Sequence, residues 1–275
     1  MLIIIIFRLE FLIIKKDIVI YRVEGEEKGT IFCIHGNSSS SKVFESLFNS
    51  TELKQSIVVI DLPGHGTNQN IDDELPNFSF FSLKNYLLKA VSEVNDGVLL
   101  IGNSLGGHLA IEIATEIKNL KGLVIMGTPP LKKPINFQEA FIQVPELNTF
   151  FKEFPTDEEI EAITEIAMVN KKNKHIIIDD FKRSNPLVRS ALAVDLSEDS
   201  FEDEYDVFTN LTIPKYIIAG DSDPSVNRSY LDQIKNECRI NCELIEINDC
   251  GHYPSVDRPL EFNRIIEEIC KNIFD

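Results

Sequence analysis

A serine flanked by glycines carries the strongest chemical signal in the sequence. The run Gly102-Asn103-Ser104-Leu105-Gly106 fits the pattern G-x-S-x-G, which sets a serine nucleophile on a sharp turn between a strand and a helix. An apolar run at 98–101 precedes it and an amphipathic run follows it, as this turn requires. Side chains at positions 102 and 106 would collide with neighbouring backbone. We therefore expect Ser104 to be a nucleophile rather than an incidental serine in a glycine-rich turn.

A serine hydroxyl is a weak nucleophile until a base takes its proton. His252 follows a glycine and a predicted strand and precedes the last predicted helix, so we expect it to be that base. The base needs a carboxylate to orient it, and either Asp221 or Asp223 could leave the end of another strand. The Gly-x-x-Asp spacing favours Asp223, whereas Asp221 suits a turn. The chain order is then Ser104, Asp223, His252.

Acyl transfer also needs N–H donors for the oxyanion that forms on the attacked carbonyl. The backbone N–H of Leu105, directly after the nucleophile, is one candidate. The backbone N–H of Asn37, which follows the predicted strand Thr30–His35, is the other. His35 could be mistaken for a base, but we expect it to shape this loop.

Strands and helices must position these residues. Along the chain, short β-branched runs alternate with helical patterns, and this alternation predicts an α/β fold, a mostly parallel sheet with helices on both faces. Strands are predicted at 18–23, 30–35, 56–62, 97–102, 122–127, 215–220 and 242–248, and helices at 77–94, 105–117 and 259–274.

The alternation stops after residue 128, where helical signals take over. Thr156 and Glu159 form a capping box, and Asn185-Pro186 begins a helix over Leu187–Leu196. We therefore expect a core of residues 1–128 and 212–275, with a helical cap of residues 129–211 inserted in it.

The composition indicates which partners are disfavoured and which cellular compartment suits the protein. The 44 acidic residues outnumber the 27 basic ones, and the net charge of −17 would repel nucleic acid. The five scattered cysteines suggest neither a disulfide framework nor a zinc site, and favour reduced thiols in the cytoplasm. We expect no metal and no cofactor, and the oligomeric state is left undetermined.

The apolar stretch of the first fourteen residues is interrupted by Arg8 and Glu10. It lacks the basic start and small-residue cleavage site of a signal peptide and is too short to span a membrane. We expect one or two β-strands and no stable membrane insertion. A membrane-associating stretch or an imprecise start codon are the alternatives.

These motifs together resemble the α/β-hydrolase fold superfamily, in its serine esterase-like branch with a helical cap. The resemblance runs from about Asp17 to the C-terminus outside the insertion. It is carried, in order, by His35-Gly36, Asp61-Leu62-Pro63-Gly64-His65-Gly66, the serine turn at 102–107, Gly220-Asp221-Ser222-Asp223 and Gly251-His252.

The resemblance implies that loop 61–66 is a structural turn beside the active site, so that His65 is not catalytic. It also implies that the cap shapes the acyl or leaving-group pocket. The sequence departs from the family at Ser38–Ser41, where many relatives carry apolar residues, and this leaves the polarity of the pocket open.

Ser104 argues against the members of the superfamily that use aspartate or cysteine as the nucleophile. We expect a serine hydrolase that cleaves a small carboxylic ester or thioester through an acyl-enzyme, with a small-molecule acyl substrate. His252 must be neutral to act as base, so activity should fall below pH ~6.5. Two alternatives stay open. One is hydrolysis of a carbon–carbon bond next to a carbonyl, because asparagine before the serine is seen in the enzymes that catalyse it. The other is a non-catalytic ligand-binding role.

Overall fold

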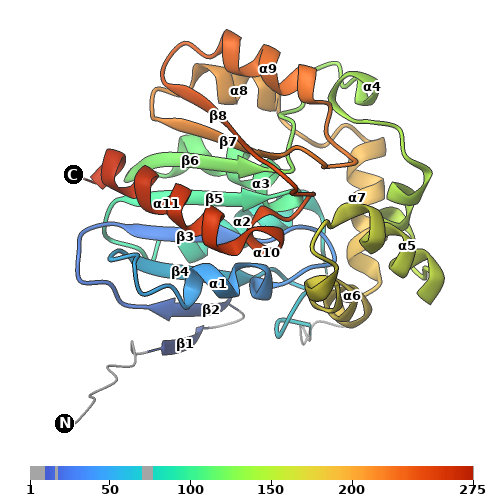
Figure 1. Cartoon of the computed structure of the whole chain (residues 1–275), viewed down its shortest axis with the longest axis horizontal. Helices are drawn as coiled ribbons and strands as arrows, with labels where there is room; N and C mark the ends of the chain where they lie inside the picture. Colours follow the sequence, from blue (N-terminus) through green and yellow to red (C-terminus); the bar gives the residue numbers. More distant parts are fainter. Residues whose placement is uncertain (1–9, 16–17, 70–76, 275) are drawn as a thin grey trace.

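One eight-stranded sheet forms the centre of the molecule in the computed structural model, which describes residues 10–15, 18–69 and 77–274 (Figure 1). The strand order across the sheet is β1-β2-β4-β3-β5-β6-β7-β8. β2 runs antiparallel to its neighbours β1 and β4, and the remaining strands are parallel. The strands are β1 (Glu10–Lys15), β2 (Ile18–Val23), β3 (Thr30–Ile34), β4 (Ser56–Asp61), β5 (Val98–Asn103), β6 (Leu120–Met126), β7 (Lys215–Gly220) and β8 (Cys242–Ile247).

The predicted α/β fold is confirmed, and the seven predicted strands differ from the observed ones by at most two residues at either end. β1 lies within the apolar N-terminal stretch and confirms a strand there, whereas residues 1–9 fall outside the described part of the chain. No helix within the described residues is both long and apolar enough to cross a membrane.

Helices cover both faces of the sheet (Figure 1). One face carries α2 (Phe80–Val91), α3 (Leu105–Ile113), α8 (Glu204–Asn210) and α9 (Arg228–Glu237), and the other carries α1 (Glu45–Phe48), α10 (Pro254–Asp257) and α11 (Pro259–Phe274). Because the parallel strands β3, β4 and β5 are enclosed on both sides, every residue in them is buried, which explains their continuous apolar runs. The predicted helix at 105–117 is observed as α3 followed by a 3-10 turn.

Helices also fill the stretch between β6 and β7, which contains α4 (Phe137–Ala140), α5 (Asp157–Ala167), α6 (Lys174–Arg183), α7 (Leu187–Ser197) and α8. The capping box of Thr156 and Glu159 opens α5 as predicted. Figure 1 shows α5, α6 and α7 beyond the end of the sheet, whereas α8 lies over the sheet beside α9. The Tyr205 and Phe208 side chains of α8 belong to the hydrophobic core of that face.

Candidate active site

The turn between β5 and α3 holds Ser104 in a strained conformation. Its φ of 53° and ψ of −121° lie in a region that a residue other than glycine adopts only when its surroundings enforce it. A Cβ on Gly102 would lie 2.3 Å from the Gly106 carbonyl oxygen, and one on Gly106 would lie 2.3 Å from the Ile34 oxygen. The two glycines therefore let the chain turn sharply. The Ser104 N–H donates to the Met126 oxygen at 2.9 Å, which ties the turn to β6.

The structure brings Asp223 to His252. Their Oδ2 and Nδ1 atoms lie 2.9 Å apart, and the two side chains are only 8% and 9% exposed. Asp221 is exposed, and its Oδ1 accepts the Cys250 N–H at 3.2 Å and the Ser222 hydroxyl at 2.9 Å. Asp221 therefore has a turn-forming geometry, and Asp223 is the aspartate in contact with the histidine.

The electrostatics of this pair favour the charged form of both groups. Burial alone would lower the pKa of His252, but the Asp223 carboxylate outweighs it and raises the pKa above its ordinary value. Burial alone would raise the pKa of Asp223, but His252 and the hydrogen bonds from Ser225 outweigh it and lower the pKa. At neutral pH Asp223 is therefore an anion, and the imidazole is a stronger base than free histidine.

Ser225 is part of this arrangement, and sequence reasoning missed it. Its hydroxyl donates to Asp223 Oδ1 at 2.6 Å and lies 3.0 Å from His252 Nδ1, while its backbone N–H also reaches Asp223 Oδ1 at 2.8 Å. An aspartate that accepts the N–H two residues later forms an Asx turn. The spacing of Asp223 and Ser225 was the available signal.

Asn103 joins the histidine loop to the serine turn. Its side-chain amide donates to the Met126 and His252 carbonyl oxygens, each at 3.1 Å. Gly127, at the end of β6, has φ of +61°, and a Cβ there would lie 2.6 Å from His252 Cε1. The loop of His252 therefore packs beside the turn that carries Ser104.

Asp257 binds the same histidine loop to the helical stretch. Its buried carboxylate accepts the Gly251 N–H at 2.7 Å and, from the segment after α5, the Val169 and Asn170 N–H groups at 3.2 and 2.9 Å. The His252 N–H donates to the oxygen of Ala167, the last residue of α5, at 2.8 Å. The backbone at Gly251 and His252 is thus held in place.

The loop after β3 adjoins the nucleophile. A Cβ on Gly36 would lie 3.1 Å from Ser104 Cβ. Within the described part of the chain, neither the Asn37 N–H nor the Leu105 N–H donates a hydrogen bond. Two free N–H groups near a serine could bind the oxyanion of a tetrahedral intermediate.

His35 and His65 lie beneath this loop, with ring centroids 5.1 Å apart. His35 Nε2 accepts the Leu62 N–H at 3.0 Å, so its Nδ1 carries the proton and donates to the Gly36 oxygen at 2.7 Å. Burial lowers the pKa of His35, and lowers that of His65 to about 3. Both rings are therefore neutral, and His35 has contacts that shape the loop.

A cavity of about 460 Å³ lies among α5, α6 and α7, with Phe154, Ile160, Phe181 and Arg189 among its lining residues. Neither Ser104 nor His252 lines it. In residues 10–15, 18–69 and 77–274, no three His, Cys, Asp or Glu side chains gather in a way that could hold a metal ion.

Comparisons with known proteins place the chain in a family. The model of the alpha/beta hydrolase family matches residues 31–265. A 108-residue segment, 38% of this chain, is 31% identical to a Drosophila melanogaster protein named "Probable serine hydrolase". A 97-residue segment, 35% of this chain, is 27% identical to a pimeloyl-[acyl-carrier protein] methyl ester esterase of Xylella fastidiosa. These matches span only 33% and 35% of the two relatives.

Solved structures match the chain over nearly its whole length. An N-acyl homoserine lactonase complexed with N-hexanoyl homoserine has a TM-score of 0.83 at 20% identity, and the match covers 97% of this chain and 98% of the lactonase. A thermophilic esterase from Thermogutta terrifontis has a TM-score of 0.74 at 17% identity. That match covers 98% of this chain and 100% of the esterase. At this level of identity the likeness establishes a shared fold.

Proposed function

Because the chain belongs to the alpha/beta hydrolase family, we propose that it hydrolyses small carboxylic esters or thioesters. Ser104 is the nucleophile, His252 the general base and Asp223 the carboxylate that orients the base. The observation that carries the proposal is the 2.9 Å contact between His252 and Asp223, in a loop that Asn103 ties to the strained serine turn.

All five cysteines are free, which favours the cytoplasm as the compartment.

The reaction proceeds through an acyl-enzyme. His252 takes the proton of the Ser104 hydroxyl as its oxygen attacks the carbonyl carbon, and Asp223 stabilises the imidazolium that results. The Leu105 and Asn37 N–H groups bind the oxyanion. The intermediate collapses, and the alcohol or thiol leaves with the proton from His252. A water molecule then gives a proton to His252 and attacks the acyl group, and the acid is released from Ser104, which regains its proton.

The substrate range is proposed from chemistry and from the similar proteins. A lactone is a cyclic ester, so the same nucleophile and oxyanion donors would open it. The lactonase and the methyl ester esterase among the similar proteins make acyl lactones and acyl methyl esters sensible first substrates.

Hydrolysis of a carbon–carbon bond stays the second candidate, since it would use the same three residues. Its sequence argument was the asparagine before the nucleophile. In the structure Asn103 is buried and bonds two backbone carbonyls, a structural task that either reaction needs. The residue therefore no longer favours carbon–carbon cleavage.

The test is covalent labelling with a fluorophosphonate, which should modify Ser104 and fail with Ser104→Ala. A panel of p-nitrophenyl esters of increasing acyl length, with N-hexanoyl homoserine lactone and a vinylogous β-diketone, would then assign the reaction. Turnover of esters or the lactone supports the proposal, whereas turnover of the diketone alone identifies carbon–carbon cleavage. A folded wild-type protein that is neither labelled nor active would favour the ligand-binding role.

A further inference from the structure

The loop that supplies Asn37 is bound by the helical stretch between β6 and β7. We call residues 36–41 the oxyanion loop and residues 129–211 the cap segment. The Asn37 side-chain amide donates to the Phe150 oxygen at 2.8 Å. Arg189 Nη1 donates to the Ser38 hydroxyl at 3.2 Å, and the Ser40 hydroxyl donates to Asp180 Oδ2 at 2.5 Å. Of the four serines that depart from the family pattern, Ser38 and Ser40 thus make hydrogen bonds to the cap segment.

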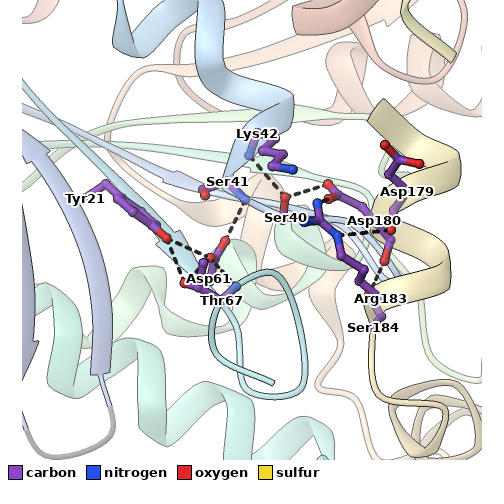
Figure 2. Close-up of polar contacts among 10 residues, drawn as sticks. All are labelled: Tyr21, Ser40, Ser41, Lys42, Asp61, Thr67, Asp179, Asp180, Arg183 and Ser184. Carbon is purple, nitrogen blue, oxygen red and sulfur yellow. Dashed lines mark hydrogen bonds and ion pairs between the residues drawn. The ribbon is translucent and has the colours of Figure 1, made fainter. Parts of the chain in front are cut away.

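Asp180 is the buried carboxylate in this set. It lies on α6, only 1% exposed, and points at Ser40 in Figure 2. Its second oxygen accepts Arg183 Nη2 at 3.0 Å. The neighbouring Asp179 is exposed. The two aspartates therefore differ in one respect that matters here: only Asp180 contacts the oxyanion loop.

A second buried carboxylate holds the next residue of the loop from the core side. Asp61, at the end of β4, accepts the Ser41 N–H at 2.8 Å and both the N–H and the hydroxyl of Thr67 at 2.9 Å (Figure 2). Ser40 and Ser41 are thus held by carboxylates from opposite sides, Asp180 from the cap segment and Asp61 from the core. The Ser40 hydroxyl also accepts the Lys42 N–H at 3.3 Å and caps the short 3-10 helix that follows.

The loop needs this support because its backbone is strained. Ser38 has φ of +54°, a left-handed conformation that costs a residue with a side chain of the order of 1 kcal/mol. Oxyanion donors stabilise a transition state only when they are held within about 0.5 Å of the productive position. Three hydrogen bonds to the cap segment, at Asn37, Ser38 and Ser40, hold the loop in this conformation. Loss of the one at Ser40 would let Ser38 relax and would move the adjacent Asn37 N–H.

We propose that Asp180 is a positioning residue for catalysis: through Ser40 it lets the cap segment hold the oxyanion loop so that the Asn37 N–H faces the developing oxyanion. The inference rests on the proposed ester hydrolysis. Asp180 acts as an acceptor for the Ser40 hydroxyl, so an amide oxygen in its place would preserve the contact. It touches neither the substrate nor Ser104.

The experiment compares Asp180→Ala, Asp180→Asn and the matched control Asp179→Ala by kcat per fluorophosphonate-titrated site. We expect kcat to fall roughly 10- to 100-fold in Asp180→Ala, because misplaced catalytic groups lose rate on that scale, with KM changed less than about 2-fold. Asp180→Asn should retain most of the activity, and Asp179→Ala should equal the wild type. The inhibition constant of a trifluoromethyl ketone, whose adduct places an oxyanion in the site, should rise with the loss of kcat.

Ser40→Ala tests the same link from the loop side, and it stands in for Asp180→Ala if that variant does not fold. Ser40→Ala should lower kcat to a similar extent. The double variant of Asp180→Ala and Ser40→Ala should have a kcat no lower than that of the less active single variant. A purely structural role would lower thermal stability and leave kcat per titrated site and the ketone affinity unchanged, and this result would overturn the inference. Absence of Ser104 labelling in the wild type would overturn the proposed function itself, and the inference with it.

Discussion

The side-chain amide of Asn103 donates a 3.1 Å hydrogen bond to the backbone carbonyl of His252, 149 residues further along the chain. Asn103 is the residue directly before Ser104, so one side chain joins the turn of the nucleophile to the loop of the base. Because of this bond, the position of His252 relative to Ser104 does not depend on two loops that move independently.

Removal of that amide should reduce both activity and stability. In Asn103→Ala the Met126 oxygen keeps the Ser104 N–H as a donor, whereas the His252 oxygen loses the donor it has. We expect unfolding to cost roughly 1–3 kcal/mol less and kcat/KM to fall about 100-fold because His252 shifts. Urea unfolding and ester hydrolysis measure the two effects.

Asn119→Ala is the matched control for that prediction. Asn119 also donates its amide to a backbone carbonyl, that of Val94 at 3.0 Å, but it lies before β6, at the opposite end of the sheet from Ser104. It should lose stability and keep kcat/KM per folded molecule. Equal kcat/KM in both variants would contradict a role for Asn103 in placing His252.

The pH dependence of kcat/KM should report His252. Only the neutral imidazole can take the serine proton, so activity is lost as the pH falls through the pKa of this group. Asp223 raises that pKa above the ordinary value of 6.5, so the midpoint of the loss should lie above pH 6.5, higher than the sequence alone predicted. Asp221→Asn should leave the midpoint unmoved, and a rate that stays flat down to pH 5 would refute the assignment.

Exchange of the two aspartates for asparagine should separate their roles. Asp223→Asn removes the charge that contacts His252 at 2.9 Å, and loss of the equivalent charge in a triad costs about 10⁴-fold in rate. Asp221→Asn alters an exposed side chain that bonds Cys250 and Ser222 and should stay within about 3-fold of wild type. Steady-state hydrolysis of one ester by both variants decides the matter, and the reverse ranking would exchange the roles.

Ser225→Ala should shift the acid limb of the pH profile to higher pH. The Ser225 hydroxyl shares the charge of Asp223 by donating at 2.6 Å, so its removal leaves more negative charge facing His252 and stabilises the imidazolium. We expect a kcat loss below about 10-fold together with the shift. Ser222→Ala removes a comparable hydroxyl from Asp221 and should change neither quantity. A downward shift in Ser225→Ala would contradict this account.

Much of the architecture could be predicted from local patterns. Strand and helix positions follow from runs of apolar residues whose spacing depends on neighbours in the chain, as in the continuous apolar residues of β4 or the capping box before α5. The serine turn was local in part. A side chain on Gly102 would clash with Gly106 within the turn itself, whereas a side chain on Gly106 would clash with Ile34 of the neighbouring strand β3.

The sequence by itself determined the fold class, the turn of Ser104 and the short set of residues from which a triad could be drawn. Only the tertiary structure decided which of these side chains meet: Asp223 rather than Asp221 at His252, Ser225 beside both, and Asp180 at Ser40 across 140 residues. The physical reason is that a hydrogen bond forms only when donor and acceptor lie about 3 Å apart, within a few tenths of an ångström. Those distances are set where strand ends and distant helices pack together. Spacing along the chain could favour Asp223 and link Ser225 to it, but it could not bring either of them to His252.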